Sequence, residues 1–249
     1  MPLIAAIVHE LKRIVMQRSF WFATAALILI LGLVFYLLIE NFIQFKQAEL
    51  LAQHSSFGVT EEVLHPWFGW SALLALIFLP LLTMQTLSGE RKHHTLVLYQ
   101  LSALTTAQII AAKFIALSLI LQAVLGVFAM LPLSLISLGP VDLGQILSSF
   151  IGLELWLHAL LALGILMSAW VKAPLMAALL SFGTCIFMGL LEWSGIGGFQ
   201  LLSKLSLLFH LKSFLAGFIS IQNLGCFLIF ILSCMLMTCF RMKREPIYS

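Results

Sequence analysis

Charged residues are scarce in this chain. Asp, Glu, Lys and Arg together make up 9% of the 249 residues, whereas 62% are hydrophobic. A water-soluble domain carries roughly 25% charged residues, because its surface must face water. The mean hydropathy is correspondingly high, at +1.10. This composition excludes a soluble protein and indicates a chain that is solvated by lipid.

Motifs for metal binding and catalysis are also lacking. The sequence has no G-x-x-x-x-G-K-[ST] loop to hold the phosphates of ATP, no H-E-x-x-H, and no G-x-S-x-G. Its cysteines lie in apolar runs at spacings that match no zinc pattern. They are Cys185, Cys226, Cys234 and Cys239. We therefore predict no catalytic residues, no metal site and no cofactor in this chain, which is not expected to be an enzyme.

Long apolar runs dominate what is present. A helix needs roughly 20 mainly apolar residues to cross the hydrocarbon core, and it satisfies its own backbone hydrogen bonds there. Six segments meet this length, at about 20–39, 67–88, 114–138, 145–170, 173–193 and 223–240. We expect one all-α integral membrane domain over 1–249 with six transmembrane helices. Segment 40–66 is expected to be an outer loop, and segment 196–222 to form outer interfacial or re-entrant helices before the last span.

The distribution of Lys and Arg predicts the orientation. Ten of the thirteen basic residues lie at the termini and in alternate connections, and only Lys46, Lys204 and Lys212 lie on the other side. Basic residues concentrate in cytoplasmic segments. We therefore expect both termini in the cytoplasm. Because topology accounts for the basic residues, they give no reason to expect nucleic-acid binding.

The N-terminal segment 1–19 has an amphipathic pattern. Apolar residues recur at helical spacing from Leu3 to Val15, and the other side carries Glu10, Lys12 and Arg13. Such a helix is suited to the inner headgroup layer. We expect an elbow helix that meets a cytoplasmic partner, with an unstructured basic flank as the alternative.

The stretch from Leu79 to Lys113 is the most informative part of the chain. A span containing Pro80 ends in a charged turn, and a short semi-polar helix is expected to follow at about 95–101. Thr105 or Thr106 is the expected N-cap of the next helix, because a threonine hydroxyl accepts from the free N–H groups of the first turn.

This stretch resembles the type-2 ABC-transporter permeases (ABC-2), and more narrowly those of the gliding-motility type. The matching features include a proline, a charged turn, a threonine followed by leucines, a Ser/Thr-containing turn and a lysine. They are Pro80, Leu82-Thr83-Met84, Glu90-Arg91, Thr95 to Leu98, Ser102 to Thr106 and Lys113; Leu205-Ser206, His210, Phe214 to Gly217 and Arg241 to Arg244 also match. The Gly89-Glu90 and His93-His94 pairs depart from the family pattern.

The resemblance implies a permease subunit of an ABC exporter in the bacterial inner membrane. Region 89–102 would be a coupling helix that docks on a separate ATP-binding subunit, which binds the ATP and Mg. Glu90, Arg91, Thr95 and Leu98 are the expected contact residues. The permease would work as a homodimer or heterodimer with two ATPase subunits, surrounded by membrane lipid. Exporters of lipid, polysaccharide, peptide, drug and haem share this layout.

Two features lie within the expected spans. Glu154 and His158 are one helical turn apart and can pair, either as a structural tether or as part of a translocation path. Small residues recur at four-residue steps along the fifth span and predict a close packing seam, within the subunit or in a permease dimer. They are Ala173, Ala177, Ser181, Cys185 and Gly189.

Two other functions are consistent with a polytopic chain of this kind. A stand-alone secondary transporter or channel would place several polar groups near the midplane. A scaffold subunit without transport activity would need none. The ABC-2 permease remains the expectation, because the stretch from Leu79 to Lys113 resembles that family, although an ordinary cytoplasmic loop is the alternative for region 89–102.

Overall fold

The computed structural model describes residues 2–52, 58, 60–92, 104–135, 142–194 and 206–244, and within these ranges the chain is mainly helical and has no strand. The longer helices are α1 (Pro2–Val15), α2 (Arg18–Ala52), α3 (His65–Thr83), α6 (Thr106–Ser134), α7 (Leu143–Trp170), α8 (Pro174–Ser194) and α11 (Ile221–Lys243). The shorter ones are the π-helical turn η1 (Thr60–Leu64), α4 (Ser88–Lys92) and α10 (Leu207–Leu215).

The length and apolarity of these helices define a helical membrane protein. Five of the described helical segments are long and apolar enough to cross a bilayer. They are Arg18–Gln44, Thr60–Arg91, Thr106–Ser134, Leu143–Trp170 and Ile221–Lys243. The predicted fifth span corresponds to α8, whose apolar part, Pro174–Leu190, is shorter than the other five.

One predicted boundary is wrong. Residues 40–52, expected in an outer loop, continue α2, which runs for 35 residues. The physical reason is that polar residues with good helix propensity, such as Gln44, Lys46 and Gln47, end an apolar run without ending a helix. The predicted second span, 67–88, lies within the apolar segment Thr60–Arg91, although α3 ends at Thr83 and a turn precedes α4.

The N-cap of α6 confirms the sequence expectation. The Thr105 hydroxyl accepts from the backbone N–H of Gln108 at 3.3 Å, and the Gln108 side chain accepts from the N–H of Thr105 at 2.9 Å. These reciprocal bonds form a capping box, which stabilises the first turn of the helix.

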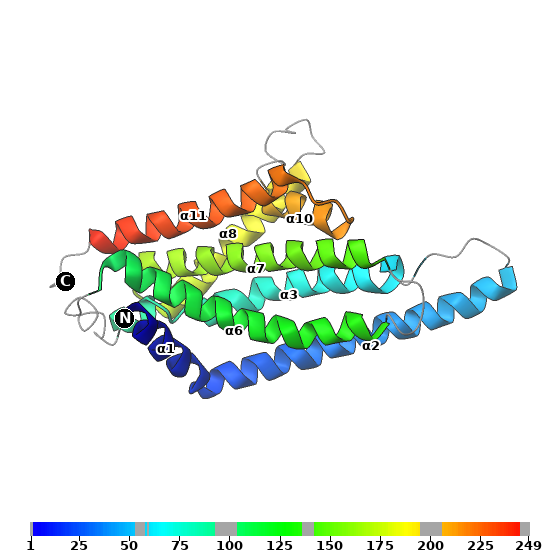
Figure 1. Ribbon diagram of the computed structural model, residues 1–249, viewed down its shortest axis with the longest axis horizontal. Coiled ribbons are helices and arrows are strands. Elements are labelled where there is room, and N and C mark those ends of the chain that lie inside the picture. Colours follow the sequence, from blue (N-terminus) through cyan, green and yellow to red (C-terminus); the bar gives the residue numbers. More distant parts are fainter. Residues whose placement is uncertain are drawn as a thin grey trace.

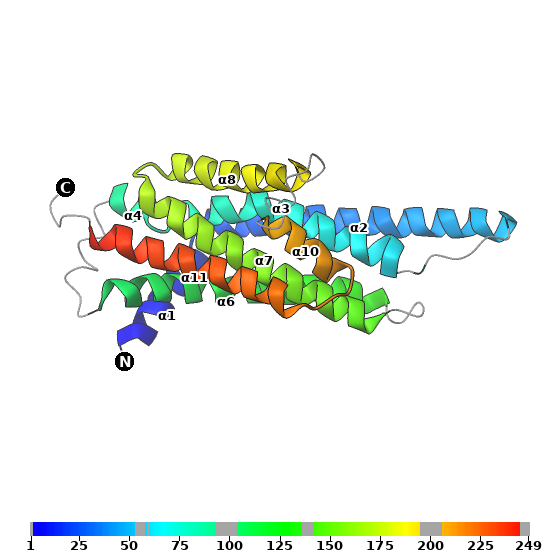
Figure 2. The ribbon, with the colours of Figure 1, turned by 90° about the horizontal axis from the view of Figure 1, so that it is seen from above.

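Helix α7 lies at the centre of the bundle, with α3 and α11 packed along it (Figures 1 and 2). Two glycines of α7 permit the close approach of α3 and α10. A Cβ atom added at Gly164 would lie 2.0 Å from Thr83 Oγ1 on α3, and one at Gly152 would lie 2.4 Å from Phe214 Cβ on α10. Both distances are far below van der Waals contact, so a side chain at either position would force the helices apart.

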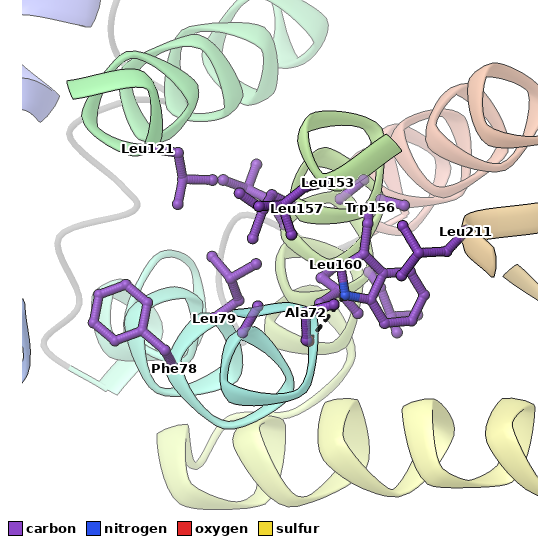
Figure 3. Packing of buried hydrophobic residues seen from close by; sticks show 14 of the residues in the cluster. Ala72, Phe78, Leu79, Leu121, Leu153, Trp156, Leu157, Leu160 and Leu211 are labelled. Carbon is purple, nitrogen blue, oxygen red and sulfur yellow. Dashed lines mark hydrogen bonds between the residues drawn. The ribbon is translucent and has the colours of Figure 1, made fainter. Parts of the chain in front are cut away.

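An apolar cluster fills the space between α3 and α7. Trp156 lies within it, 2% exposed, and its indole N–H donates to the carbonyl oxygen of Ala72 at 3.1 Å (Figure 3). This bond satisfies a polar group that would otherwise be buried without a partner. It also fixes α7 against the middle of α3.

Helix α10 is the described part of the segment expected to form short outer helices. It packs on α7, where the Ser148 hydroxyl donates to the carbonyl oxygen of Phe214 at 2.8 Å. Its end is a Schellman motif, with Gly217 at a φ of 89° and the N–H of Phe218 bonded to the carbonyl oxygen of Ser213. The carboxyl end of the short helix is therefore anchored to α7.

The small-residue stripe of α8 faces the interior of this chain. Ala177, Ser181 and Cys185 are 1%, 1% and 4% exposed, and α8 packs on α3, α7 and α10. A Cβ atom on Gly189 would lie 3.3 Å from a side-chain carbon of Leu208. Ala173, at the start of the stripe, is exposed. The three central positions are thus occupied within one chain and offer no surface to a second copy.

The start of the chain and the carboxyl end of α11 lie at the same end of the bundle (Figure 1). Helices α1 and α4 and the beginning of α6 lie there as well. Arg13, Arg91, Lys113 and Lys243 belong to these segments, and we call this the basic end of the bundle. Helix α10 lies towards the opposite end.

Candidate functional site

Four charged side chains from three helices converge at the basic end. Lys113 Nζ of α6 lies 2.7 Å from Glu10 Oε1 of α1 and 2.5 Å from Glu90 Oε1 of α4. Arg13 Nη2 lies 3.0 Å from Glu10 Oε2, and Arg13 Nη1 also pairs with Glu90 Oε1. The charges alternate around a closed loop of contacts, which we call the ionic ring. It joins residues that are up to 103 positions apart in the sequence.

Three members of the ionic ring are almost completely buried. Glu10, Glu90 and Lys113 are 2%, 4% and 2% exposed, and only the Arg13 side chain reaches solvent, with 35% exposed. Two acids and two bases give the ring no formal net charge. Removing one partner of a buried pair costs roughly 3–5 kcal/mol, because the remaining charge is left uncompensated. The ring therefore specifies how α1, α4 and α6 fit together.

Helix α4 owes its position to the end of α7. The hydroxyl of Ser168 on α7 accepts from the backbone N–H groups of Leu87 and Ser88, at 3.0 and 2.9 Å. These N–H groups precede or begin a helix and have no intrahelical acceptor. Ser168 thereby holds the start of α4, and with it Glu90, in register with α7.

Helix α1 presents a different face to the bundle from the one its sequence pattern suggests. Glu10, expected on the water-facing side, is buried, while the apolar Ile4 and Val8 are 58% and 44% exposed. The reason is electrostatic, since Lys113 supplies the opposite charge that lets a carboxylate enter the interface. The exposed apolar residues and Lys12 then form a surface suited to the headgroup layer.

Glu90, one of the residues expected to contact a partner, has its carboxylate inside the ionic ring and is 4% exposed. Arg91 is partly exposed, and its Nη2 lies 3.5 Å from the Met242 sulfur on α11. Thr95 and Leu98, the other two expected contacts, lie outside the described residues, which stop at Lys92 and resume at 104.

A second polar group joins α6 to α7 within the apolar part of the bundle. His158 Nδ1 lies 3.2 Å from Glu154 Oε1, as expected for residues one turn apart. His158 Nε2 lies 2.5 Å from the hydroxyl oxygen of Ser118, and the Gln122 amide donates to Glu154 Oε1. The His158 and Glu154 side chains are 16% and 26% exposed. The arrangement is a tether between helices that also reaches the surface of the chain.

Sequence reasoning missed the ionic ring, although two signals for it exist. Glu10 and Arg13 stand three residues apart and so share one face of α1. Lys113 is an isolated cation in the apolar run of α6, and an ionisable group in such a run needs a counter-charge. In the described part of the chain, no three His, Cys, Asp or Glu side chains gather to bind a metal ion.

No family model matches the chain, and no curated protein matches it.

Proposed function

We propose that this chain is the membrane-spanning subunit of an ATP-driven exporter of the ABC-2 type. The observation that carries the proposal is the ionic ring, which links the N-terminal helix, the segment after α3 and the start of α6. The sequence resemblance over Leu79 to Lys113 supports the same class. In this proposal the basic end faces the cytoplasm of a bacterial cell, in agreement with the positive-inside rule.

The ring offers a route for mechanical coupling. An ATP-binding subunit that docks on region 89–102 would press on α4, which carries Glu90. Because Glu90 pairs with both Arg13 and Lys113, the load would pass to α1 and α6 together. Arg91, Thr95 and Leu98 are the proposed contacts with the partner, and Glu90 is a positioning residue. The partner would supply ATP and Mg, and two permeases would act with two ATPase subunits.

Co-purification tests the proposal. The tagged chain is extracted from native membranes in a mild detergent, and bound proteins are identified by mass spectrometry. We expect a protein carrying the phosphate-binding loop G-x-x-x-x-G-K-[ST], which this chain lacks. Arg91→Glu should reduce its recovery several-fold, because the substitution reverses the charge at the proposed contact. Lys172→Glu is the matched control, since Lys172 is an exposed base in the turn between α7 and α8 at the same end.

ATP hydrolysis by the purified complex separates docking from coupling. Glu90→Gln should leave the partner bound but lower substrate-stimulated ATPase activity, because the positioning residue is altered and the surface is not. Recovery of the chain without any ATP-binding protein, or equal loss with Arg91→Glu and Lys172→Glu, would contradict the proposal.

A stand-alone ion-coupled transporter is the second candidate, and the α6–α7 polar group favours it. Ionisable residues in membrane spans often mark ion or proton pathways. In that case the purified chain alone should carry a proton flux in proteoliposomes, and Glu154→Gln should abolish it. A chain without flux, or a flux unchanged by Glu154→Gln, would exclude this alternative.

A further inference from the structure

The polar group that joins α6 to α7 lies near the middle of two apolar helices. Glu154 follows the start of α7 at Leu143 by three turns, and Gln122 precedes the end of α6 at Ser134 by more than three turns. At 1.5 Å per residue, each is roughly 16 Å or more from the nearer end of its helix, about half the thickness of the hydrocarbon core. The group is therefore far from the headgroup layer on either side.

The described residues leave this group with the negative charge of Glu154. His158 Nδ1 lies 2.8 Å from the backbone carbonyl oxygen of Glu154, which only accepts, so Nδ1 carries a hydrogen. Its Nε2 then accepts from the Ser118 hydroxyl at 2.5 Å, and a neutral imidazole makes both bonds. Helix α7 contains no Lys or Arg, and the single lysine of α6, Lys113, belongs to the ionic ring.

Two oxygen atoms of the group accept no hydrogen bond from the described residues. Glu154 Oε1 lies beside His158 and accepts from the Gln122 amide, whereas no bond is made to Glu154 Oε2. Because a carboxylate oxygen only accepts, the Gln122 amide nitrogen must face it and the amide oxygen is turned away. The Glu154 side chain is 26% exposed, and Gln122 is exposed. Two acceptors on adjacent side chains are thus left for a ligand that carries several N–H groups.

The surface of α6 beside these acceptors is apolar. Ile115 and Leu119 are 38% and 49% exposed. They share one face of the helix with Ser118 and Gln122, because the four positions recur at three- and four-residue steps. Leu121 points instead into the apolar cluster between the helices (Figure 3). An unneutralised carboxylate and an exposed aliphatic surface therefore lie side by side, which is the complement of an amphipathic cation.

We propose that the α6–α7 polar group binds the ammonium group of an amphipathic primary amine that enters from the bilayer. The ammonium donates to Glu154 Oε2 and to the Gln122 amide oxygen, and the apolar part of the molecule lies over Ile115 and Leu119. Its positive charge compensates the carboxylate at a depth where water does not. As the substrate site of an exporter, this inference rests on the proposed function, whereas amine binding itself needs no ATPase partner.

Other occupants fit less well. A second copy of the chain brings no base to this depth, because every Lys and Arg of the described spans lies within about two turns of a span end. A divalent metal ion takes about six oxygen ligands, more than these side chains present. A proton would neutralise Glu154 but would leave the amide oxygen of Gln122 and the aliphatic surface without a ligand.

Equilibrium binding to the purified chain tests the site. The protein is placed in nanodiscs of phosphatidylcholine, which has no net charge, and titrated with monodansylcadaverine, an apolar fluorophore linked to a primary amine. The N-acetyl derivative of this probe has the same apolar part without the charge and is the matched control ligand. We expect fluorescence anisotropy, corrected for empty nanodiscs, to show saturable binding of one amine per chain, at least tenfold tighter than that of the N-acetyl derivative.

Two substitutions and their matched controls locate the binding. Glu154→Gln removes the charge at constant size and should weaken amine binding at least tenfold, whereas Glu62→Gln, at an exposed acid of η1, should not. Gln122→Leu removes one acceptor and should weaken binding roughly three- to tenfold, the effect of one lost hydrogen bond to a charged group. Gln222→Leu, at an exposed position of α11, is its control.

Gln122→Leu keeps the test valid if Glu154→Gln fails to fold, because it alters an exposed side chain and leaves the carboxylate in place. Amine binding that these variants weaken and the controls retain supports the site, even where no ATP-binding protein co-purifies. If an ATP-binding protein co-purifies but wild type binds the amine no more tightly than its N-acetyl derivative, the site is overturned and the exporter proposal stands. Equal affinity for the amine in wild type and in either variant would also overturn the site.

Discussion

Replacing Lys113 by methionine removes one cation from the ionic ring and keeps a side chain of similar length. Of the two cations of the ionic ring, Arg13 would then remain, and the ring would carry one net negative charge. Both carboxylates are at most 4% exposed, so water offers little compensation. A buried pair broken on one side costs roughly 3–5 kcal/mol. We expect Lys113→Met to destabilise the protein by about that amount.

A second substitution distinguishes net charge from the number of contacts. In Lys113→Met combined with Glu10→Gln, Arg13 and Glu90 remain as a neutral pair. If the uncompensated charge causes the destabilisation, the double variant should regain roughly half of the loss, although it has fewer ionic contacts than the single variant. If individual contacts decided the outcome, the double variant would be the less stable of the two.

Thermal unfolding in a mild detergent, followed by tryptophan fluorescence at one fixed scan rate, measures the relative stabilities of wild type, the single variant and the double variant. For a chain of this length, 1 kcal/mol corresponds to a Tm change of about 2–4 °C, so a loss of about 4 kcal/mol lowers Tm by about 8–16 °C. Lys12→Met is the control, because Lys12 is exposed on the same helix and surface changes stay within about 0.5 kcal/mol. A Tm of Lys113→Met within about 2 °C of wild type, or a double variant below the single one, would refute the reasoning.

Two further substitutions test how α3 and α4 are attached to α7. Gly164→Ala places a methyl group 2.0 Å from Thr83 Oγ1 and should destabilise the protein by about 1–3 kcal/mol through overpacking. Adding Thr83→Ala should restore part of the lost stability. Equal Tm values for the single and double variants would contradict this expectation. Ser168→Ala removes the acceptor of the Leu87 and Ser88 N–H groups and should lower the stability by about 1–3 kcal/mol. The same Tm scan measures this loss, and the amide proton of Ser88 should exchange faster with solvent. Unchanged exchange at Ser88 would argue against the cap.

The sequence was informative wherever the relevant interaction is local. The α6 cap could be predicted because Thr105 and Gln108 interact across three residues. The Glu154–His158 pair could be predicted because both lie on one helix, one turn apart. The length of α2 could not be predicted from hydropathy, which detects the end of an apolar run, whereas Gln47 and Glu49 continue the helix without being apolar.

The ionic ring could not be predicted in the same way, because its partners are distant in the chain. Its formation depends on α1 packing against α6, and no local pattern states which helix α1 will meet. The basic residues of these segments also have an independent explanation in membrane topology, which conceals any pairing among them. Burial distinguishes a lysine that forms an ion pair from one that only marks the cytoplasmic side, since Lys113 is buried while Lys12 is exposed.

The ring lies between two groups of helices that are held together differently. The Thr83 side chain packs against Gly164 and fixes α3 to α7, and the Ser168 hydroxyl holds the start of α4, and neither contact tolerates sliding. Helix α1 packs mainly on α6, and charged contacts through Glu90 link this pair to α4. A charged side chain can exchange one partner for another without leaving its site, whereas a glycine contact has no second arrangement. Movement between the two groups is therefore expected to occur at the ring, where Arg13 already reaches solvent and can release Glu90 while Lys113 continues to neutralise it.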